Sequence, residues 1–397
     1  MPATPRRSLT LAVFIDAYGW RVSEQHPLLA GELTERRPLE TVFGYSSSCD
    51  PTILTGTMPQ AHGHFTFFRY APDASPFRSL TPLWRALSWL PGSLTNRGRI
   101  RRYLSRAVGR LLGVTGYFQL YAARFDRLPL FDYTERRDLY QPGGINGGQP
   151  TIFDRLRADG IPYFCSNWRQ SDARNFLDMQ AALAGGAPRF AYLFLGALDA
   201  VLHRDGTHST AAAATIADYD TELRRLLATA RTQYDDVALM VFSDHGMTDI
   251  TATCDLQSTI DALGFTFGTD YGAVYDSTMA RFWFMHDEAR TRITAALEGV
   301  ADGRVLTDDD LARYECAFPG QHYGELFFLL RPGVLMLPSD LGRSPLAGMH
   351  GFAPEDPDST AFFGALGHTS PAPQRLADLH DVMLSSVHAQ RAHTHAA

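Results

Sequence analysis

The chain of 397 residues has only four cysteines, and no two of them are closely spaced: they are Cys49, Cys165, Cys254 and Cys316. This pattern argues against both a disulfide framework and a cysteine-ligated zinc site. The sequence also lacks any window of about 18 apolar residues, the length that a helix needs to cross a bilayer. We therefore expect no transmembrane helix.

An overall basic balance is missing as well. The net charge is −7 and the isoelectric point is about 6.0, whereas proteins that bind nucleic acid in general are usually basic. The first apolar run, residues 9–15, is short and ends in Asp16 without a cleavage-type stretch behind it, so no signal peptide is predicted. We expect a cytoplasmic protein without general nucleic-acid binding.

What the sequence does contain is a regular alternation of short apolar runs and helix-like segments. The expected strands are residues 9–15, 162–165, 191–198 and 237–242, and the expected helices include residues 150–159 and 211–229. This alternation is typical of an α/β fold with a mostly parallel sheet flanked by helices. Because ligands of such sheets bind outside the carboxyl ends of the strands, Asp16, Asp199 and Asp244 are site candidates.

Two stretches interrupt the alternation and predict insertions. Residues 68–148 are rich in arginine, proline and aromatics, and we expect a cap; residues 251–346 mix strand-like and helix-like pieces, and we expect a smaller α+β lid. The core would then comprise residues 1–67, which hold the nucleophile candidate, residues 149–250 and residues 347–388. A polar tail, residues 389–397, is expected to be disordered.

Within the cap, residues 99–112 predict an amphipathic helix. Apolar residues recur with a period of 3.6, and the opposite face carries Arg99, Arg101, Arg102, Arg106 and Arg110. We expect a cap helix that packs on its own domain. A contact with a membrane surface or a partner, and a homodimer contact, remain the alternatives.

The most specific local signal is residues 45–56, YSSSCDPTILTG, followed by Pro59 and by His62-Gly63. A hydroxyl at a helix N-terminus lies beside exposed backbone N–H groups and the positive end of the helix dipole, which favour an anionic phosphate. A serine hydroxyl is a weak nucleophile until a metal or a base activates it. The alternative is that this serine run only caps a helix.

Three further segments supply carboxylate and imidazole groups. Asp199 and His203 are four residues apart, so they share one face of a helical turn and can reach one ion. Asp244 and His245 are adjacent and precede a glycine, which permits the sharp turn that would direct both to one ion. His350 is flanked by glycines, a pattern that by itself is also typical of a surface turn.

Together these segments resemble the type I phosphodiesterase/nucleotide pyrophosphatase branch of the alkaline phosphatase superfamily. In that branch a hydroxyl nucleophile lies nine residues before a Thr-Gly pair, so Thr55-Gly56 points to Ser46. The resemblance implies an alkaline-phosphatase-like fold and two divalent metal ions. Mixed carboxylate and imidazole donors favour zinc, with manganese and iron as alternatives. One ion would be held by Asp199, His203 and His350, and the other by Asp16, Ser46, Asp244 and His245.

The sequence departs from related patterns at two points. Sulfatases of this superfamily need proline and arginine two and four residues after the modified position, where this chain has Ser48 and Asp50, so the maturation signal is missing. The phosphodiesterases more often use threonine as nucleophile, whereas alkaline phosphatases use serine. The preference between phosphate monoesters and diesters therefore stays open.

The function that the resemblance implies is metal-dependent hydrolysis of phosphodiester or nucleotide pyrophosphate bonds through a phosphoseryl intermediate. The substrate would be a small phosphorylated or nucleotide-like molecule. Arg69, Arg169 and Arg281 are candidates to bind its phosphate, as arginine often does. The alternatives are a phosphomonoesterase or phosphoryl transferase acting on a small metabolite and, in another class, a catalytically silent binding protein.

Overall fold

The computed structural model describes residues 7–367 and 371–395. Its largest sheet has six strands in the order β2-β16-β7-β1-β6-β5. Strands β7, β1, β6 and β5 run parallel, and β16 pairs antiparallel with both β7 and β2. The strands are β1 (Ser8–Ile15), β2 (Glu35–Leu39), β5 (Tyr163–Cys165), β6 (Phe190–Leu195), β7 (Asp236–Phe242) and β16 (Ala361–Leu366). The predicted α/β class with a mostly parallel sheet is confirmed.

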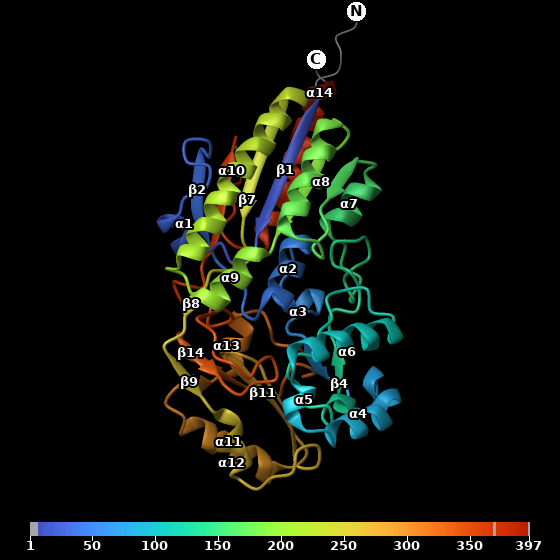
Figure 1. The fold of residues 1–397 in the computed structure, drawn as a ribbon, viewed down its shortest axis with the longest axis vertical. Helices are drawn as coiled ribbons and strands as arrows, with labels where there is room; N and C mark the ends of the chain where they lie inside the picture. The colour runs from blue at the N-terminus through green and yellow to red at the C-terminus, as the bar shows by residue number, and fades with distance from the viewer. Residues whose placement is uncertain (1–6, 368–370, 396–397) are drawn as a thin grey trace, which may run out of the picture.

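Helices cover both faces of this sheet, because successive side chains of each buried strand point to opposite sides (Figure 1). Leu11 and Val13 of β1 belong to one hydrophobic core, and Ala12 and Phe14 belong to the other. The first core is completed by α1 (Trp20–Gln25), α8 (Asp172–Ala184) and α10 (Thr210–Gln233). The second is completed by α2 (Ser46–Thr55), α7 (Ile152–Ala158) and α14 (Asp378–His395).

A second, antiparallel sheet forms the lid below the main sheet (Figure 1). Its strand order is β10-β11-β13-β12, and a parallel pair of β9 and β14 lies beside it. The elements are β9 (Ala252–Cys254), α11 (Leu256–Asp261), β10 (Tyr271–Tyr275), β11 (Met279–Phe284), α12 (Asp287–Glu298), β12 (Gly303–Val305), α13 (Asp308–Arg313), β13 (Leu326–Leu330) and β14 (Val334–Met336). An α+β lid was the expectation for this part of the chain.

The cap is built from short helices around a two-stranded antiparallel sheet, β3 with β4, and it packs on the lid. Its core surrounds the buried Trp84 and includes Val274 and Trp283 from the lid sheet. The elements after the short helix α3 (Pro59–His62) are β3 (Phe68–Tyr70), η1 (Pro76–Leu80), α4 (Thr81–Ser88), α5 (Gly92–Thr95), α6 (Gly98–Leu111), η2 (Leu128–Leu130) and β4 (Phe131–Tyr133).

Helix α6 is the predicted amphipathic helix, but it does not bury its whole apolar face. Val108 is buried in the cap core, whereas Ile100, Tyr103 and Leu111 are 42%, 71% and 68% exposed. Arg101, expected on the solvent face, is buried and donates hydrogen bonds to the carbonyls of residues 95 and 123. A 3.6-residue period shows which residues share a face, but not how much of that face a neighbour covers.

The C-terminal segment also differs from expectation. Helix α14 continues to His395, where we expected a disordered tail from residue 389, and residues 396–397 lie outside the described part of the chain. Among the described residues, no helix is long and apolar enough to cross a membrane.

Candidate active site

The three predicted acidic residues lie at one edge of the main sheet. Strand β1 pairs in parallel with β6 on one side and with β7 on the other, so the carboxyl ends of these strands meet. Asp16 follows β1 and Asp244 follows β7 directly after one serine. Asp199 lies in the first turn of α9 (Ala197–Asp205), the helix that begins just after β6.

A first group of possible metal ligands consists of Asp199, His203 and His350. One donor atom of each lies within 4.8 Å of the other two, and Asp199 Oδ1 is 3.2 Å from His203 Nε2 and 3.8 Å from His350 Nε2. Nδ1 of His203 is 2.8 Å from the carbonyl of Gly348. Because a carbonyl only accepts, Nδ1 carries a proton, and Nε2 is the nitrogen that faces the group.

The second group consists of Asp16, Asp244 and His245. As in the first group, a histidine Nε2 faces carboxylate oxygens and the Nδ1 of the same ring bonds to a backbone carbonyl. Nε2 of His245 lies 3.0 Å from Asp244 Oδ2 and 3.8 Å from Asp16 Oδ1. Nδ1 of His245 donates to the carbonyl of Gly246 over 2.8 Å, so Nε2 is the nitrogen that faces the carboxylates. Asp244 has no exposed surface, and its other oxygen accepts from the backbone N–H of Ala17 over 3.2 Å.

His350 connects the two groups although it lies about a hundred residues after His245. It follows β15 (Gly348–Met349), which pairs antiparallel with β8 (Thr248–Asp249), a strand that begins three residues after His245. The rings of His245 and His350 stack with centroids 3.7 Å apart at an angle of 12°. Burial, and then the neighbouring His245, hold the pKa of His350 well below its usual value, so His350 is neutral, as a ligand must be.

The carboxylates of the two groups are short of positive partners. Asp16 Oδ1, Asp199 Oδ1 and Asp244 Oδ2 are buried and have no hydrogen-bond partner among the described residues. Burial, and then the charges of Asp244 and Asp199, raise the pKa of Asp16 well above its usual value. Burial also acts to raise the pKa of Asp199, but the neighbouring His203 and His350 lower it overall. Buried carboxylates at such distances are stabilised by cations. The donor atoms therefore fit two divalent metal ions, one in each group.

Ser46 is the serine of its run that faces these groups. It is the first residue of α2, and its Oγ lies 3.2 Å from His245 Nε2. Its neighbours are turned away, because Ser47 Oγ donates to the carbonyl of Phe65 and Ser48 Oγ donates to that of Tyr45. The geometry therefore favours Ser46 within the run, while its role as nucleophile stays a prediction.

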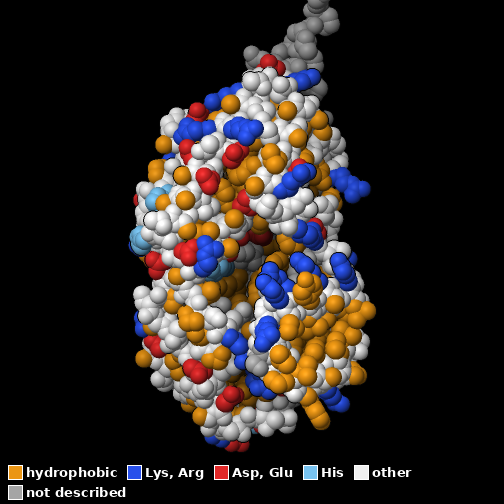
Figure 2. Space-filling view, viewed as in Figure 1, with side chains coloured by type: hydrophobic (Ala, Val, Ile, Leu, Met, Phe, Trp, Pro, Cys, Tyr) orange, Lys and Arg blue, Asp and Glu red, His pale blue; other side chains and the backbone are white. Residues whose placement is uncertain are grey.

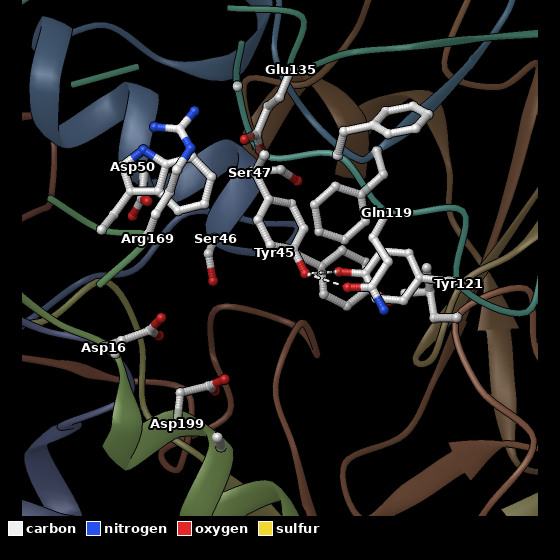
Figure 3. A pocket seen from close by; sticks show the side chains of 18 of the residues that line it. Asp16, Tyr45, Ser46, Ser47, Asp50, Gln119, Tyr121, Glu135, Arg169 and Asp199 are labelled. Atoms are coloured by element: carbon white, nitrogen blue, oxygen red, sulfur yellow. Dashed lines mark hydrogen bonds between the residues drawn. The ribbon is translucent and has the colours of Figure 1, made fainter. Parts of the chain in front are cut away.

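The two groups and Ser46 open into a cleft of about 1250 Å³ between the core and the cap. Figure 3 shows Asp16, Asp199 and Ser46 around one space in this cleft. Aromatic side chains line the opposite wall: Phe67, Tyr117, Tyr121 and Trp168. Phe67 lies 5.6 Å from Tyr117 and 5.2 Å from Tyr121, measured between ring centroids. A flat, partly apolar molecule can stack on such a wall.

Of the three arginines predicted to bind phosphate, only Arg169 lines the cleft, and it is paired with Asp138 over 2.8 Å. Arg69 lies outside the cleft and pairs with Asp132 over 2.6 Å. Arg281 is fully buried in the lid, where it pairs with Asp276 over 2.8 Å. The structure gives these two arginines structural partners instead of a place at the substrate: Arg69 joins the two cap strands, and Arg281 joins the lid to the cap through the carbonyl of Phe68.

Sequence reasoning missed three polar residues of the cleft. Tyr45 precedes Ser46, and its hydroxyl accepts from the backbone N–H of Thr278 in the lid over 3.0 Å. Asp50 accepts from a tyrosine hydroxyl over 2.8 Å, and burial, followed by the charge of Asp244, raises its pKa well above the usual value. Asp50 lies four residues after Ser46 on the same helix, and this spacing could have predicted that both face the cleft. No local pattern in the sequence predicts that Glu135 lies there.

A mostly parallel sheet with carboxylate and imidazole groups gathered at its carboxyl edge defines an α/β protein of the alkaline phosphatase type. Residues 34–352 match the family model "type I phosphodiesterase / nucleotide pyrophosphatase", and the chain belongs to this family. The match contains every predicted ligand except Asp16. No sequence match to a curated protein was found.

Solved structures agree with this fold. The chain resembles human ectonucleotide pyrophosphatase/phosphodiesterase 5 with a TM-score of 0.67 and 15% identity, over 96% of this chain and 95% of that chain. The murine protein of the same name gives a TM-score of 0.67 at 14% identity over the same shares. An inactive variant of it in complex with AMP gives 0.67 at 15% identity, again over 96% and 95%. At this identity the likeness shows the fold.

Glu135 gives the cleft a testable dependence on pH. Burial, and then the negative charge of Asp138, raises the pKa of Glu135 to about 8 from its usual value of 4.5. Between these values the folded state holds a proton that the unfolded state has lost. The contribution of Glu135 to the free energy of unfolding therefore falls as pH rises through this window, by at most about 1.4 kcal/mol per pH unit.

We expect Glu135→Gln to remove this slope. Urea unfolding at pH 5, 7 and 9 should show wild type losing stability relative to the variant as the pH rises. The matched control is Glu298→Gln at the exposed end of α12, which should follow wild type at all three values. Parallel stability curves for wild type and Glu135→Gln would show that Glu135 is ionised in the folded protein.

Proposed function

We propose that this protein is a two-metal phosphohydrolase that cleaves phosphodiester or nucleotide pyrophosphate bonds through a phosphoseryl intermediate on Ser46. The observation that carries the proposal is the convergence of Ser46 with two carboxylate and imidazole groups at one cleft. Family membership supports hydrolysis of this bond type. Five separate segments of sequence contribute to this convergence. If Ser46 only capped a helix, these groups would not need to lie beside it.

Asp199, His203 and His350 would hold one ion, and Asp16, Asp244 and His245 would hold the other together with Ser46. Carboxylate and imidazole donors of this kind suit zinc. The bound ions would supply Lewis-acid stabilisation of the negative charge that develops during transfer and would favour the deprotonated serine hydroxyl.

The protein's own residues then perform a double displacement. Ser46 loses its proton to solvent, and its Oγ attacks phosphorus while the bond from phosphorus to the leaving oxygen breaks. The leaving alkoxide takes a proton from solvent, or leaves as phosphate, and the phosphoseryl intermediate keeps the substrate's other ester group. Water then attacks the same phosphorus, the bond to Ser46 Oγ breaks, and the serine hydroxyl is restored. The N-terminus of α2 presents its backbone dipole to the phosphoryl oxygens throughout.

Two features support a nucleotide-like substrate. The wall formed by Phe67, Tyr117, Tyr121 and Trp168 suits a flat ring system. A murine protein of the same fold was solved in complex with AMP. A phosphomonoesterase or phosphoryl transferase remains the second candidate, because the nucleophile is serine and further arginines line the cleft. The catalytically silent binding protein is the alternative of another class.

Turnover on matched nitrophenyl esters tests the proposal. We expect the zinc-loaded protein to prefer bis(nitrophenyl) phosphate over nitrophenyl phosphate by tenfold or more in kcat/KM, which corresponds to about 1.4 kcal/mol. Ser46→Ala should lose at least about a thousandfold in kcat, since no other hydroxyl replaces the nucleophile.

The control for this experiment is Ser47→Ala, the adjacent serine that bonds to a backbone carbonyl. It should stay close to wild type. A monoester preference would move the protein to the phosphatases, and wild-type turnover in Ser46→Ala would remove the nucleophile assignment. If the wild-type protein shows no turnover that a chelator abolishes, the silent binding protein is favoured.

Metal content tests the ligand sets without relying on turnover. Asp199→Asn removes the carboxylate charge from the first group, so we expect about one of two zinc equivalents to be lost after dialysis, as measured by elemental analysis. Asp205→Asn is a matched control, because Asp205 ends the same helix, α9, and pairs with Arg204. Two retained equivalents in Asp199→Asn would contradict the assignment.

A further inference from the structure

The inner face of α6 lines the active-site cleft with arginine. Arg102, Arg106 and Arg110 are four residues apart, so they form one row along the helix, and all three line the cleft that holds Ser46 and the two metal groups. Figure 2 shows basic side chains along the cap side of the central hollow. The same helix face presents Ser105 and Gly109 to the cleft, and these small residues leave room beside the row.

The three guanidinium groups in this row have no counter-ion of their own. Within the described part of the chain, none of them makes a hydrogen bond or an ion pair, in contrast to Arg69, which is paired with Asp132. Like charges four residues apart on a helix destabilise it. The three side chains are exposed, so this repulsion is modest, and a bound anion would offset it. Guanidinium groups bind phosphate with favourable geometry.

We propose that Arg102, Arg106 and Arg110 form a second anion subsite that selects substrates with a phosphate group in addition to the phosphodiester that reacts. This inference rests on the proposed function and names its substrate class more narrowly: a small phosphodiester that carries a further phosphate. The reacting phosphoryl group lies at Ser46, and the additional phosphate lies against α6. The cleft of about 1250 Å³ can contain both parts of such a molecule.

A matched pair of ligands tests the subsite. Thymidine 3′,5′-bisphosphate and thymidine 5′-monophosphate differ by one phosphate, and their nitrophenyl 5′-esters are the corresponding diester substrates. We expect zinc-loaded wild type to bind the bisphosphate about tenfold more tightly in calorimetry, and to show a similar ratio in kcat/KM. The triple variant R102Q/R106Q/R110Q should reduce both ratios to about twofold or less.

Arg99→Gln is the control variant, because Arg99 is an exposed residue of the same helix that does not line the cleft; it should keep the wild-type ratios. If the esters are not turned over but the binding ratio depends on the row, the subsite stands and the proposed function fails. Equal affinity for the two ligands in wild type, or an unchanged ratio in the triple variant, would overturn the subsite whatever the turnover.

The outer face of the cap carries an independent feature, an apolar patch on α4, α5 and α6 and the residues that follow α4. Figure 2 shows this patch as a continuous hydrophobic area on the cap. Trp89 is 90% exposed and Tyr103 is 71% exposed. The other exposed members are Leu83, Leu90, Leu94, Ile100 and Leu111. A patch of this kind on a soluble domain marks an interaction surface.

Two kinds of partner could cover this patch, a second copy of the chain or a lipid surface, and the charge of the surrounding segment distinguishes them. Residues 74–125 contain nine arginines and no aspartate or glutamate, in a chain whose net charge is −7. Three of the nine line the cleft and Arg101 is buried, which leaves five exposed arginines elsewhere on this segment: Arg78, Arg85, Arg97, Arg99 and Arg124. A second copy of this chain would bring two such positive segments together, which like-charge repulsion disfavours. An anionic lipid surface offers both complementary charge and an apolar phase for the exposed tryptophan and leucines.

We infer that the cap docks on anionic lipid surfaces through this patch. Co-sedimentation with vesicles of phosphatidylcholine and phosphatidylserine should retain the wild-type protein, whereas vesicles of phosphatidylcholine alone should retain at least about fivefold less. Trp89→Ala/Tyr103→Ala should lose most of this binding. The control Leu177→Ala/Met285→Ala removes exposed apolar side chains on α8 and in the lid and should bind as wild type does.

Analytical ultracentrifugation of the same variants tests whether a second copy of the chain covers the patch instead. A wild-type dimer that Trp89→Ala/Tyr103→Ala converts to monomer, without vesicle binding, would assign the patch to a second copy and overturn the inference. Equal retention on both vesicle types would also overturn it, because the arginines would then contribute nothing.

Discussion

Mutual repulsion of buried carboxylates is the constraint around which the molecule is arranged. Asp16, Asp199 and Asp244 come together where β1, β6 and β7 end, and each keeps a buried oxygen without a hydrogen-bond partner among the described residues. In a medium of low polarity this arrangement is costly unless cations are present. The surrounding elements act against the repulsion: parallel pairing fixes the strand ends, and backbone carbonyls orient the imidazoles of His203 and His245.

The lid is attached to this site by specific hydrogen bonds. Thr278, which lies between β10 and β11, donates its backbone N–H to the hydroxyl of Tyr45 over 3.0 Å and its hydroxyl to the carbonyl of Gly351 over 2.6 Å. Tyr45 precedes Ser46, and Gly351 follows His350. One lid residue thereby fixes the start of α2 relative to the last predicted ligand, and buried bonds of this kind make that side of the cleft rigid.

Much of the fold and the core of the site could be predicted from sequence, because the necessary signals are local. Apolar runs predicted β1, β5, β6 and β7 to within a few residues, and acids within two residues of the ends of such runs pointed to Asp16 and Asp244. The side chains that were misplaced are long and depend on distant partners. Arg69 and Arg281 find their carboxylates at Asp132 and Asp276, and no pattern in the sequence specifies that choice. The same limit applies to α6, whose faces were predicted but not their neighbours.

The sorting of charge in space has a consequence for how this protein approaches other molecules. A cap rich in arginine belongs to a chain that is negative overall, so the molecule carries an electric dipole moment. In the field of a negatively charged surface such a dipole experiences a torque that turns the cap forward before contact. The turning acts over roughly one Debye length, about 8 Å at physiological ionic strength. The protein would then meet a negatively charged surface with its cap already facing it, and added salt would make its orientation at contact random.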